Sequence, residues 1–190
     1  MYSGKKIILR SFEMADVEVI HKNINTWAVM RSLGFNLPRS QLSEEEWVRI
    51  ACKQDPWNDK KINFAVLDKS DNKLIGSTGL FNISPQHRRA EFSIVIFDTE
   101  NHGKGFGTDT TEVMLWVAFH ILNFHSIHLS VSDFNERGIK AYEKAGFQRI
   151  GEFRESFYIE GKYNGTILMD ILKEDFLKRY PPGKFVYQLN

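Results

Sequence analysis

Residues Asn101 to Gly107 read NHGKGFG and place three glycines and one lysine between two patterned segments. Before them, Arg89 to Phe97 has the alternation and the β-branched content of a strand. After them, Asp109 to Leu122 is apolar nearly all the way round, as in a buried helix. A glycine-rich loop that leads into a helix N-terminus is a generic anion site, because the first helical N–H groups lack intrahelical partners and the helix dipole is positive there. We therefore expect this loop to bind an anionic ligand.

Two familiar nucleotide motifs do not fit the loop. A Walker A loop needs Ser or Thr after its lysine, and Gly105 follows Lys104. A dinucleotide fingerprint would put its third glycine at Thr108 and an acid about twenty residues further on, where Ile127 and His128 stand. A nucleotide-cofactor oxidoreductase is therefore a remote alternative.

The composition favours one globular domain over 1-190, with a polar C-terminal tail over 173-190. A formal net charge of +1 without a basic block argues against nucleic acid as a partner, and the short apolar runs argue against a membrane. Cys52 is the only cysteine, which fits a cytoplasmic protein and excludes a cysteine zinc site. The histidines His120, His125 and His128 fall on a helix end, a turn and a strand, so no metal is predicted.

Periodicity and turn signals predict the element order β-α-α-β-β-β-α-β-α-β-β, which is an α/β (α+β) pattern. Ser43 and Glu46 have the spacing of a capping box and predict the start of the second helix. Glu160 to Gly165 predicts a hairpin turn before a final strand from Thr166 to Leu172.

Three segments together resemble one known family. His102 to Gly107 has the form H-x-x-G-x-G, and Asn135 to Phe147 carries the Asn, Tyr and Gly-Phe of an N-x-x-A-x-x-x-Y-x-x-x-G-F signature. His87 to Phe92 reads HRRAEF, and Tyr158 to Tyr163 reads YIEGKY. The chain resembles the GNAT superfamily of N-acetyltransferases from Ile7 to about Leu172. The branch it is most similar to contains spermidine N-acetyltransferases and ribosomal-protein N-terminal acetyltransferases.

The resemblance implies a single domain with a mixed, mostly antiparallel twisted sheet of about 6-7 strands, flanked by about four helices. It also implies acetyl-CoA as co-substrate, bound in a V-shaped gap where two central strands splay, with the loop amides around the diphosphate. His102 stands where the family usually has Gln or Arg, which removes a fixed charge. The residues that the resemblance places at the coenzyme are Ile94, Val95, Ile96, His102, Gly103, Lys104, Gly105, Phe106, Gly107, Thr108, Asn135 and Lys140.

The resemblance also implies two catalytic residues. Tyr142 would stand near the thioester sulfur, and a phenol with a pKa near 10 can protonate a departing thiolate whose conjugate acid lies near 8.5. Glu91 would accept a proton from the incoming ammonium, with a water relay favoured because a carboxylate is a weak base. An amide among residues 94–96 would bind the thioester carbonyl. Alone, Tyr142 would be read as a packing aromatic and Glu91 as an acid paired with Arg88 or Arg89.

The expected activity is direct acetyl transfer to a primary amine of a small molecule, a polyamine or a protein N-terminus. A non-catalytic acyl-CoA-binding module is the alternative, and the sequence leaves a homodimer open. Acids that could hold a polyamine are missing from the segment SLGFNLPRS and from Leu80 to Ile83, which weakens the spermidine interpretation. We expect the acceptor to contact Phe35, Leu37 and Tyr158, with Glu160 or Glu44 to Glu46 as further candidate acids.

Overall fold

The computed structural model describes residues 1–35, 37–97 and 99–181. Eight strands form one sheet in the order β1-β2-β3-β4-β5-β6-β8-β7, and all neighbours are antiparallel except β5 and β6. The strands are β1 Tyr2–Ser3, β2 Ile7–Arg10, β3 Ile62–Asp68, β4 Leu74–Ser84, β5 Arg89–Ile96, β6 Ser126–Ser132, β7 Gln148–Ile159 and β8 Lys162–Leu172. The predicted mixed, mostly antiparallel sheet is confirmed. Its additional strand is β1, which is too short for alternation to reveal.

Six α-helices accompany the sheet in the described part of the chain. They are α1 Val17–Ile24, α2 Trp27–Leu33, α3 Gln41–Ala51, α4 Phe106–Trp116, α5 Glu136–Ala145 and α6 Lys173–Arg179. Helices α2 and α6 were not predicted. Both are seven residues long and each buries one side chain, Val29 in α2 and Phe176 in α6, so neither has a repeated apolar face. The segment predicted as a polar tail therefore begins with a packed helix, while 182–190 lies outside the described residues.

Three predicted boundaries were wrong. Helix α3 begins after Ser40, whose Oγ accepts a hydrogen bond from the Ser43 N–H at 3.1 Å, so Ser43 lies inside the helix and does not cap it. Helix α4 begins at Phe106 and continues as a π-helical turn over Val117–Ile121. The last hairpin turns at Glu160 and Gly161, both with positive φ as a two-residue type I′ turn requires, so β8 begins well before Thr166.

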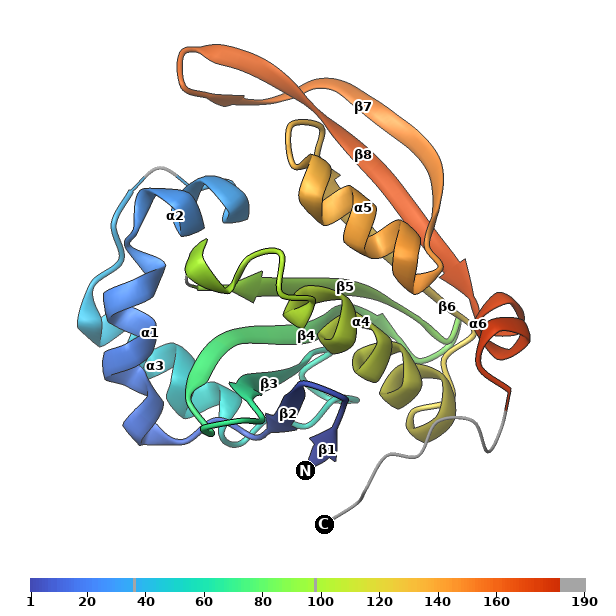
Figure 1. Cartoon of the computed structure of the whole chain (residues 1–190), viewed down its shortest axis with the longest axis horizontal. Coiled ribbons are helices and arrows are strands. Elements are labelled where there is room, and N and C mark those ends of the chain that lie inside the picture. Colours follow the sequence, from blue (N-terminus) through green and yellow to red (C-terminus); the bar gives the residue numbers. More distant parts are fainter. Residues whose placement is uncertain (36, 98, 182–190) are drawn as a thin grey trace.

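Both faces of the sheet are buried in its central strands. Phe64 and Val66 of β3 belong to a core cluster with α4, whereas Ala65 and Leu67 belong to a second cluster with α1 and α3. This division follows from strand geometry, because successive side chains point to opposite faces. Figure 1 shows α4 in front of the central strands, and α1 and α3 at the left of the view.

Strands β5 and β6 separate soon after they begin to pair. Their parallel pairing covers Arg89 to Glu91 opposite Ser126 to His128, and beyond Glu91 β5 remains paired only with β4, up to Ile96. Above the separation lie α5 and the long β7–β8 hairpin, whose tip approaches α2 (Figure 1). The Glu160 carboxylate at that tip accepts hydrogen bonds from Trp27 Nε1 at 3.4 Å and from Arg31 Nε at 3.1 Å. The divergence of β5 and β6 is the V-shaped gap that the resemblance implied.

Candidate active site

A cavity of about 560 Å³ lies along the gap between the glycine loop, the end of β5, α5 and α2, and we call it the coenzyme groove. Of the sequence-predicted residues, those that line it are Ile94, Val95, Ile96, His102, Gly103, Gly105, Phe106, Gly107, Thr108, Asn135, Lys140 and Tyr142. The structure thus brings together three segments that lie far apart in the chain. Lys104 is not in the lining, and its Nζ lies 3.3 Å from Asn101 Oδ1 of the same loop.

The loop presents bare backbone to the groove. Gly105 is the N-cap of α4 with φ 88°, a left-handed conformation that favours glycine. The first bond of the helix runs from Asp109 N–H to Gly105 O at 3.0 Å, so the N–H groups of Phe106, Gly107 and Thr108 have no acceptor within the helix. A Cβ added at Gly107 would meet nothing within 4 Å, which leaves room for a ligand. These features fit a diphosphate.

Helix α5 places the positive charge of Arg137 beside His102. His102 Nε2 lies 3.3 Å from the carbonyl oxygen of Ile96 and 3.4 Å from Nη2 of Arg137. A protonated Nε2 donates to the carbonyl oxygen, and an unprotonated one accepts from the guanidinium. Arg137 also lines the groove, so its charge stands beside the position where the family usually has Gln or Arg. Arg137 was not among the predicted site residues, although it lies inside the Asn135 motif.

The free edge of β5 offers backbone donors to the groove. The N–H of Phe97, the residue after β5, donates to Ile75 O of β4 at 2.9 Å, and the Ser93 carbonyl oxygen accepts from Thr78 Oγ1 of β4 at 2.9 Å. Odd-numbered residues therefore direct their N–H and C=O groups to β4, because these directions alternate along a strand. The amides of Ile94 and Ile96 point the other way, into the gap, whereas the Val95 amide points to β4.

Tyr142 lies on the wall of the groove that α5 contributes. Its ring contacts the rings of Phe92 and Phe147 edge-on, with centroids 6.1 Å and 6.0 Å away. Burial among these rings raises the pKa of the Tyr142 phenol to about 12, because the charged phenolate is poorly solvated there. The phenol is therefore protonated at neutral pH.

Asn135, the N-cap of α5, and Lys140 on that helix both line the groove. Asn135 caps the helix, with Oδ1 accepting from the Gly138 N–H at 3.0 Å. Lys140 Nζ lies 3.7 Å from Glu136 Oε2, and both side chains are exposed, so this pair leaves the ammonium available. Helix α2 closes the groove with Ala28, Val29 and Ser32, for which the sequence carried no signal.

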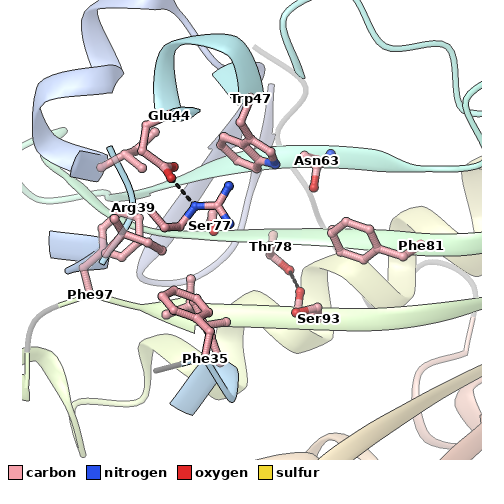
Figure 2. Close-up of a pocket in the computed structure, with 15 residues that line it drawn as sticks. Phe35, Arg39, Glu44, Trp47, Asn63, Ser77, Thr78, Phe81, Ser93 and Phe97 are labelled. Carbon is pink, nitrogen blue, oxygen red and sulfur yellow. Dashed lines mark hydrogen bonds and ion pairs between the residues drawn. The ribbon is translucent and has the colours of Figure 1, made fainter. Parts of the chain in front are cut away.

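A second cavity of about 200 Å³ lies on the α1 and α3 face of the sheet, and we call it the acceptor cavity after the role proposed for it below. Figure 2 shows side chains of β3, β4 and β5, of α3 and of the segment before it around this space. Its aromatic lining consists of Phe35, Trp47, Phe81 and Phe97, and its polar lining of Arg39, Glu44, Asn63, Ser77, Thr78 and Ser93. Val95 lines both cavities. The two cavities therefore meet at the free end of β5.

The predicted acceptor residues are only partly brought together. Phe35 lines the acceptor cavity, but Leu37 is 78% exposed and lines neither cavity. Tyr158 also lines neither, and its ring packs on Tyr163 of the same hairpin with centroids 5.2 Å apart. Glu91 lies outside both linings, and its Oε2 accepts a hydrogen bond from Asn82 Nδ2 at 2.7 Å. The alternation of β5 places Glu91 on the same face as Ser93, one step from the cavity.

Of the three acids proposed over residues 44–46, only Glu44 faces the acceptor cavity. Its side chain is 4% exposed and forms an ion pair with Nε of Arg39. The Arg39 Nη2 also donates to Ser43 Oγ at 3.2 Å (Figure 2 shows the pair with Glu44). The one carboxylate of the cavity lining is thus already paired within the chain.

Over 1–35, 37–97 and 99–181, no three His, Cys, Asp or Glu side chains are grouped as a metal ion would require. The helices in these ranges are also too short or too polar to cross a bilayer.

Comparison with known proteins agrees with this geometry. Residues 6–148 match the family described as the acetyltransferase (GNAT) domain. The chain belongs to the GNAT family of acetyltransferases. It is 34% identical to spermidine N(1)-acetyltransferase of Vibrio cholerae over 93% of this chain and 98% of that protein. It is 31% identical to spermidine N(1)-acetyltransferase of Escherichia coli K12 over 97% of this chain and 96% of that protein.

A solved structure gives the same result. The crystal structure of spermidine N-acetyltransferase from Vibrio cholerae in complex with CoA and spermine superposes with a TM-score of 0.81 at 32% identity, covering 90% of this chain and 98% of the other. The GNAT chain described here is an acetyl-CoA-dependent N-acetyltransferase with the single-domain α/β fold of that family. The alternatives of an oxidoreductase and of a non-catalytic module are thereby set aside.

Proposed function

We propose that acetyl-CoA lies in the coenzyme groove and that a primary amine approaches from the acceptor cavity. The observation that carries this proposal is the shared wall at Val95, which lines both cavities. A thioester at the end of the groove and an amine in the cavity would then meet beside the free edge of β5. Acetyl-CoA supplies an activated acetyl group when it is bound.

Different residues along the groove would contact different parts of acetyl-CoA. The loop amides and Arg137 would hold the diphosphate of acetyl-CoA. The Asn135 side-chain amide and Lys140 would contact its pantetheine arm and its adenosine end. The Ile94 amide is the preferred donor to the thioester carbonyl, because it points into the gap and lies further along β5 from the glycine loop that would hold the diphosphate than the Ile96 amide does. The Val95 amide is unsuited to that role, since it points to β4.

Tyr142 is suited to act as the general acid. A phenol that stays protonated at neutral pH can give its proton to a departing thiolate, and the raised pKa of Tyr142 keeps it in that form. Glu91 would accept the amine's proton through water, since its carboxylate lies beside the acceptor cavity and not in it. A side chain held by Asn82 can orient such a water without moving.

The acceptor cavity favours an amine with a single positive charge and an apolar neighbouring group. Each nearby carboxylate that was considered for binding already has a partner: Glu44 pairs with Arg39, Glu160 with Arg31, and Glu91 accepts from Asn82. An unpaired distal ammonium in a partly buried cavity costs several kcal/mol. Phe35, Trp47 and Phe81 offer apolar contact instead.

Spermidine is the second candidate, because the Vibrio cholerae and Escherichia coli relatives are named for it. A thiol-release assay decides between the two, with specificity constants measured side by side for spermidine, monoamines with an aromatic or alkyl body, and peptides with free N-termini. We expect the spermidine KM to lie at or above the upper end of the usual ~1 μM to 1 mM range. A clear preference for spermidine would overturn the single-charge proposal and imply that Arg39 leaves Glu44 when the polyamine binds.

A further inference from the structure

We infer that Lys6 is a positioning residue for acetyl-CoA, which it serves by holding the glycine loop from behind. Lys6 Nζ donates a hydrogen bond of 2.6 Å to the carbonyl oxygen of Lys104, 98 positions away in the sequence. Lys6 is not in the lining of the groove, whereas Gly103 and Gly105 on either side of Lys104 are. The inference rests on the proposed role of this loop in holding the diphosphate.

The peptide between Lys104 and Gly105 explains what this bond does. In a trans peptide the C=O and the following N–H point in opposite directions. A Lys104 carbonyl held toward Lys6 therefore directs the Gly105 N–H away from Lys6. A Cβ added at Gly105 would lie 3.7 Å from Lys6 Nζ, so the ammonium is close to this peptide. The Gly105 N–H is thus aimed toward the groove.

The glycine loop needs such support because its glycines allow several backbone conformations. Gly103 and Gly105 have φ values of 77° and 88°, and glycines on both sides of one residue let the intervening peptides rotate at little cost. A rotated 104–105 peptide would turn its carbonyl oxygen toward the groove and repel an anion. Lys6 favours the one orientation in which the donor faces the ligand.

Lys6 is in turn held by the helix that follows the loop. The Asp109 carboxylate, on the first turn of α4, accepts hydrogen bonds from the backbone N–H groups of Lys5 at 3.1 Å, Lys6 at 2.7 Å and Ile7 at 3.1 Å. Gly4 makes room for it, since a Cβ there would lie 2.5 Å from Asp109 Oδ2. Helix and loop therefore hold the same strand end by two independent contacts.

The test replaces Lys6 with Met, and Lys5→Met is the matched control. Lys5→Met removes an equal charge from the adjacent position and leaves its backbone N–H available to Asp109. We expect Lys6→Met to weaken CoA binding about three- to tenfold by calorimetry, the range for an exposed charge-assisted hydrogen bond that organises a loop. Lys6→Arg should recover most of the loss, because it also donates to a carbonyl oxygen.

A truncated substrate separates positioning from a general structural role. Acetylpantetheine lacks the diphosphate, so its kcat/KM should change equally little in the Lys6→Met and Lys5→Met variants. An equal loss with acetyl-CoA and acetylpantetheine, or equal CoA affinities of the two variants, would overturn the inference. Failure of the proposed function would look different: Gly105→Val would then bind CoA as tightly as the unaltered chain does.

Discussion

The phenol ring of Tyr142 stands edge-on to the ring of Phe92, with their centroids 6.1 Å apart and their planes at 89°. Phe92 is on β5 and Tyr142 is on α5, so this contact spans the two walls of the gap. Edge-to-face rings attract each other and restrict rotation of the phenol. The candidate proton donor is therefore held in place by packing between the strand that would bind the thioester and the helix that borders it.

Tyr142→Phe removes only the hydroxyl and keeps the ring contacts. We expect kcat to fall by about 10² to 10⁴, the usual size of general acid catalysis, with CoA affinity nearly unchanged. Tyr180→Phe is the control, because its hydroxyl bonds Glu112 at 2.6 Å and lines neither cavity. A decrease in kcat of less than about threefold would mean that the thiolate departs without help from Tyr142.

The raised pKa of Tyr142 predicts the alkaline pH dependence. Since the phenol stays protonated below about pH 12, kcat should not decline between pH 8 and 10 from loss of this acid. The folded pKa lies above the unfolded value of 10.0, so the contribution to stability is complete below pH 10 and is lost as the pH rises toward 12. Denaturation at pH 9 and 11 should show a smaller pH effect in Tyr142→Phe than in the unaltered chain.

Gly105→Val should abolish CoA binding while the fold survives. A β-branched residue is strained at φ 88°, and relief of that strain would reorient the loop amides. Gly161→Val is the matched control, since Gly161 also has a left-handed φ of 79°, its Cβ would meet nothing within 4 Å, and it lies outside the groove lining. Calorimetry with CoA on folded variants is the measurement, and tight binding by Gly105→Val would contradict the diphosphate assignment.

Arg137→Ala should raise the KM for acetyl-CoA with little change in kcat, because the guanidinium would act on the diphosphate end only. One exposed charge-assisted contact predicts a rise of about three- to tenfold that shrinks at high salt. Arg149→Ala is the control for net charge, since Arg149 pairs with Glu143 at 3.1 Å and lies outside the groove lining. Equal KM values for the two variants would show that Arg137 does not contribute to acetyl-CoA binding.

Phe176→Ala should lower the free energy of unfolding by about 3 to 5 kcal/mol. Phe176 is fully buried and packs on Phe119 and Tyr180, with centroids 5.2 Å and 5.0 Å away. Lys178→Ala, on the exposed side of the same helix, should change stability by less than about 0.5 kcal/mol. Urea denaturation of both variants would show whether α6 belongs to the cooperative fold, and an unchanged midpoint for Phe176→Ala would show that it does not.

Much of the coenzyme groove could be predicted from the sequence because its parts are local. The glycine loop forms one short stretch of sequence, and Asn135 and Tyr142 lie in another. In each stretch the spacing of the residues predicts a local structure, which is a loop in the first and a capped helix in the second. The cap of α3 shows the limit of such spacing. Ser40 and Ser43 are both good capping residues, and only the extended backbone of Ser40 decides which of them caps.

The sequence by itself determined the order of strand, glycine loop and helix, the identity of the family, and Asn135, Lys140 and Tyr142 as candidate groove residues. The tertiary structure alone decided that Arg137 stands beside His102, that Lys6 holds Lys104, and that Arg39 already pairs with the buried carboxylate of Glu44. Local propensity is set by neighbours within a few residues, whereas these pairings depend on where the sheet register and the packed helices bring distant segments together. Charge and shape at the acceptor cavity therefore follow from packing, which no short motif records.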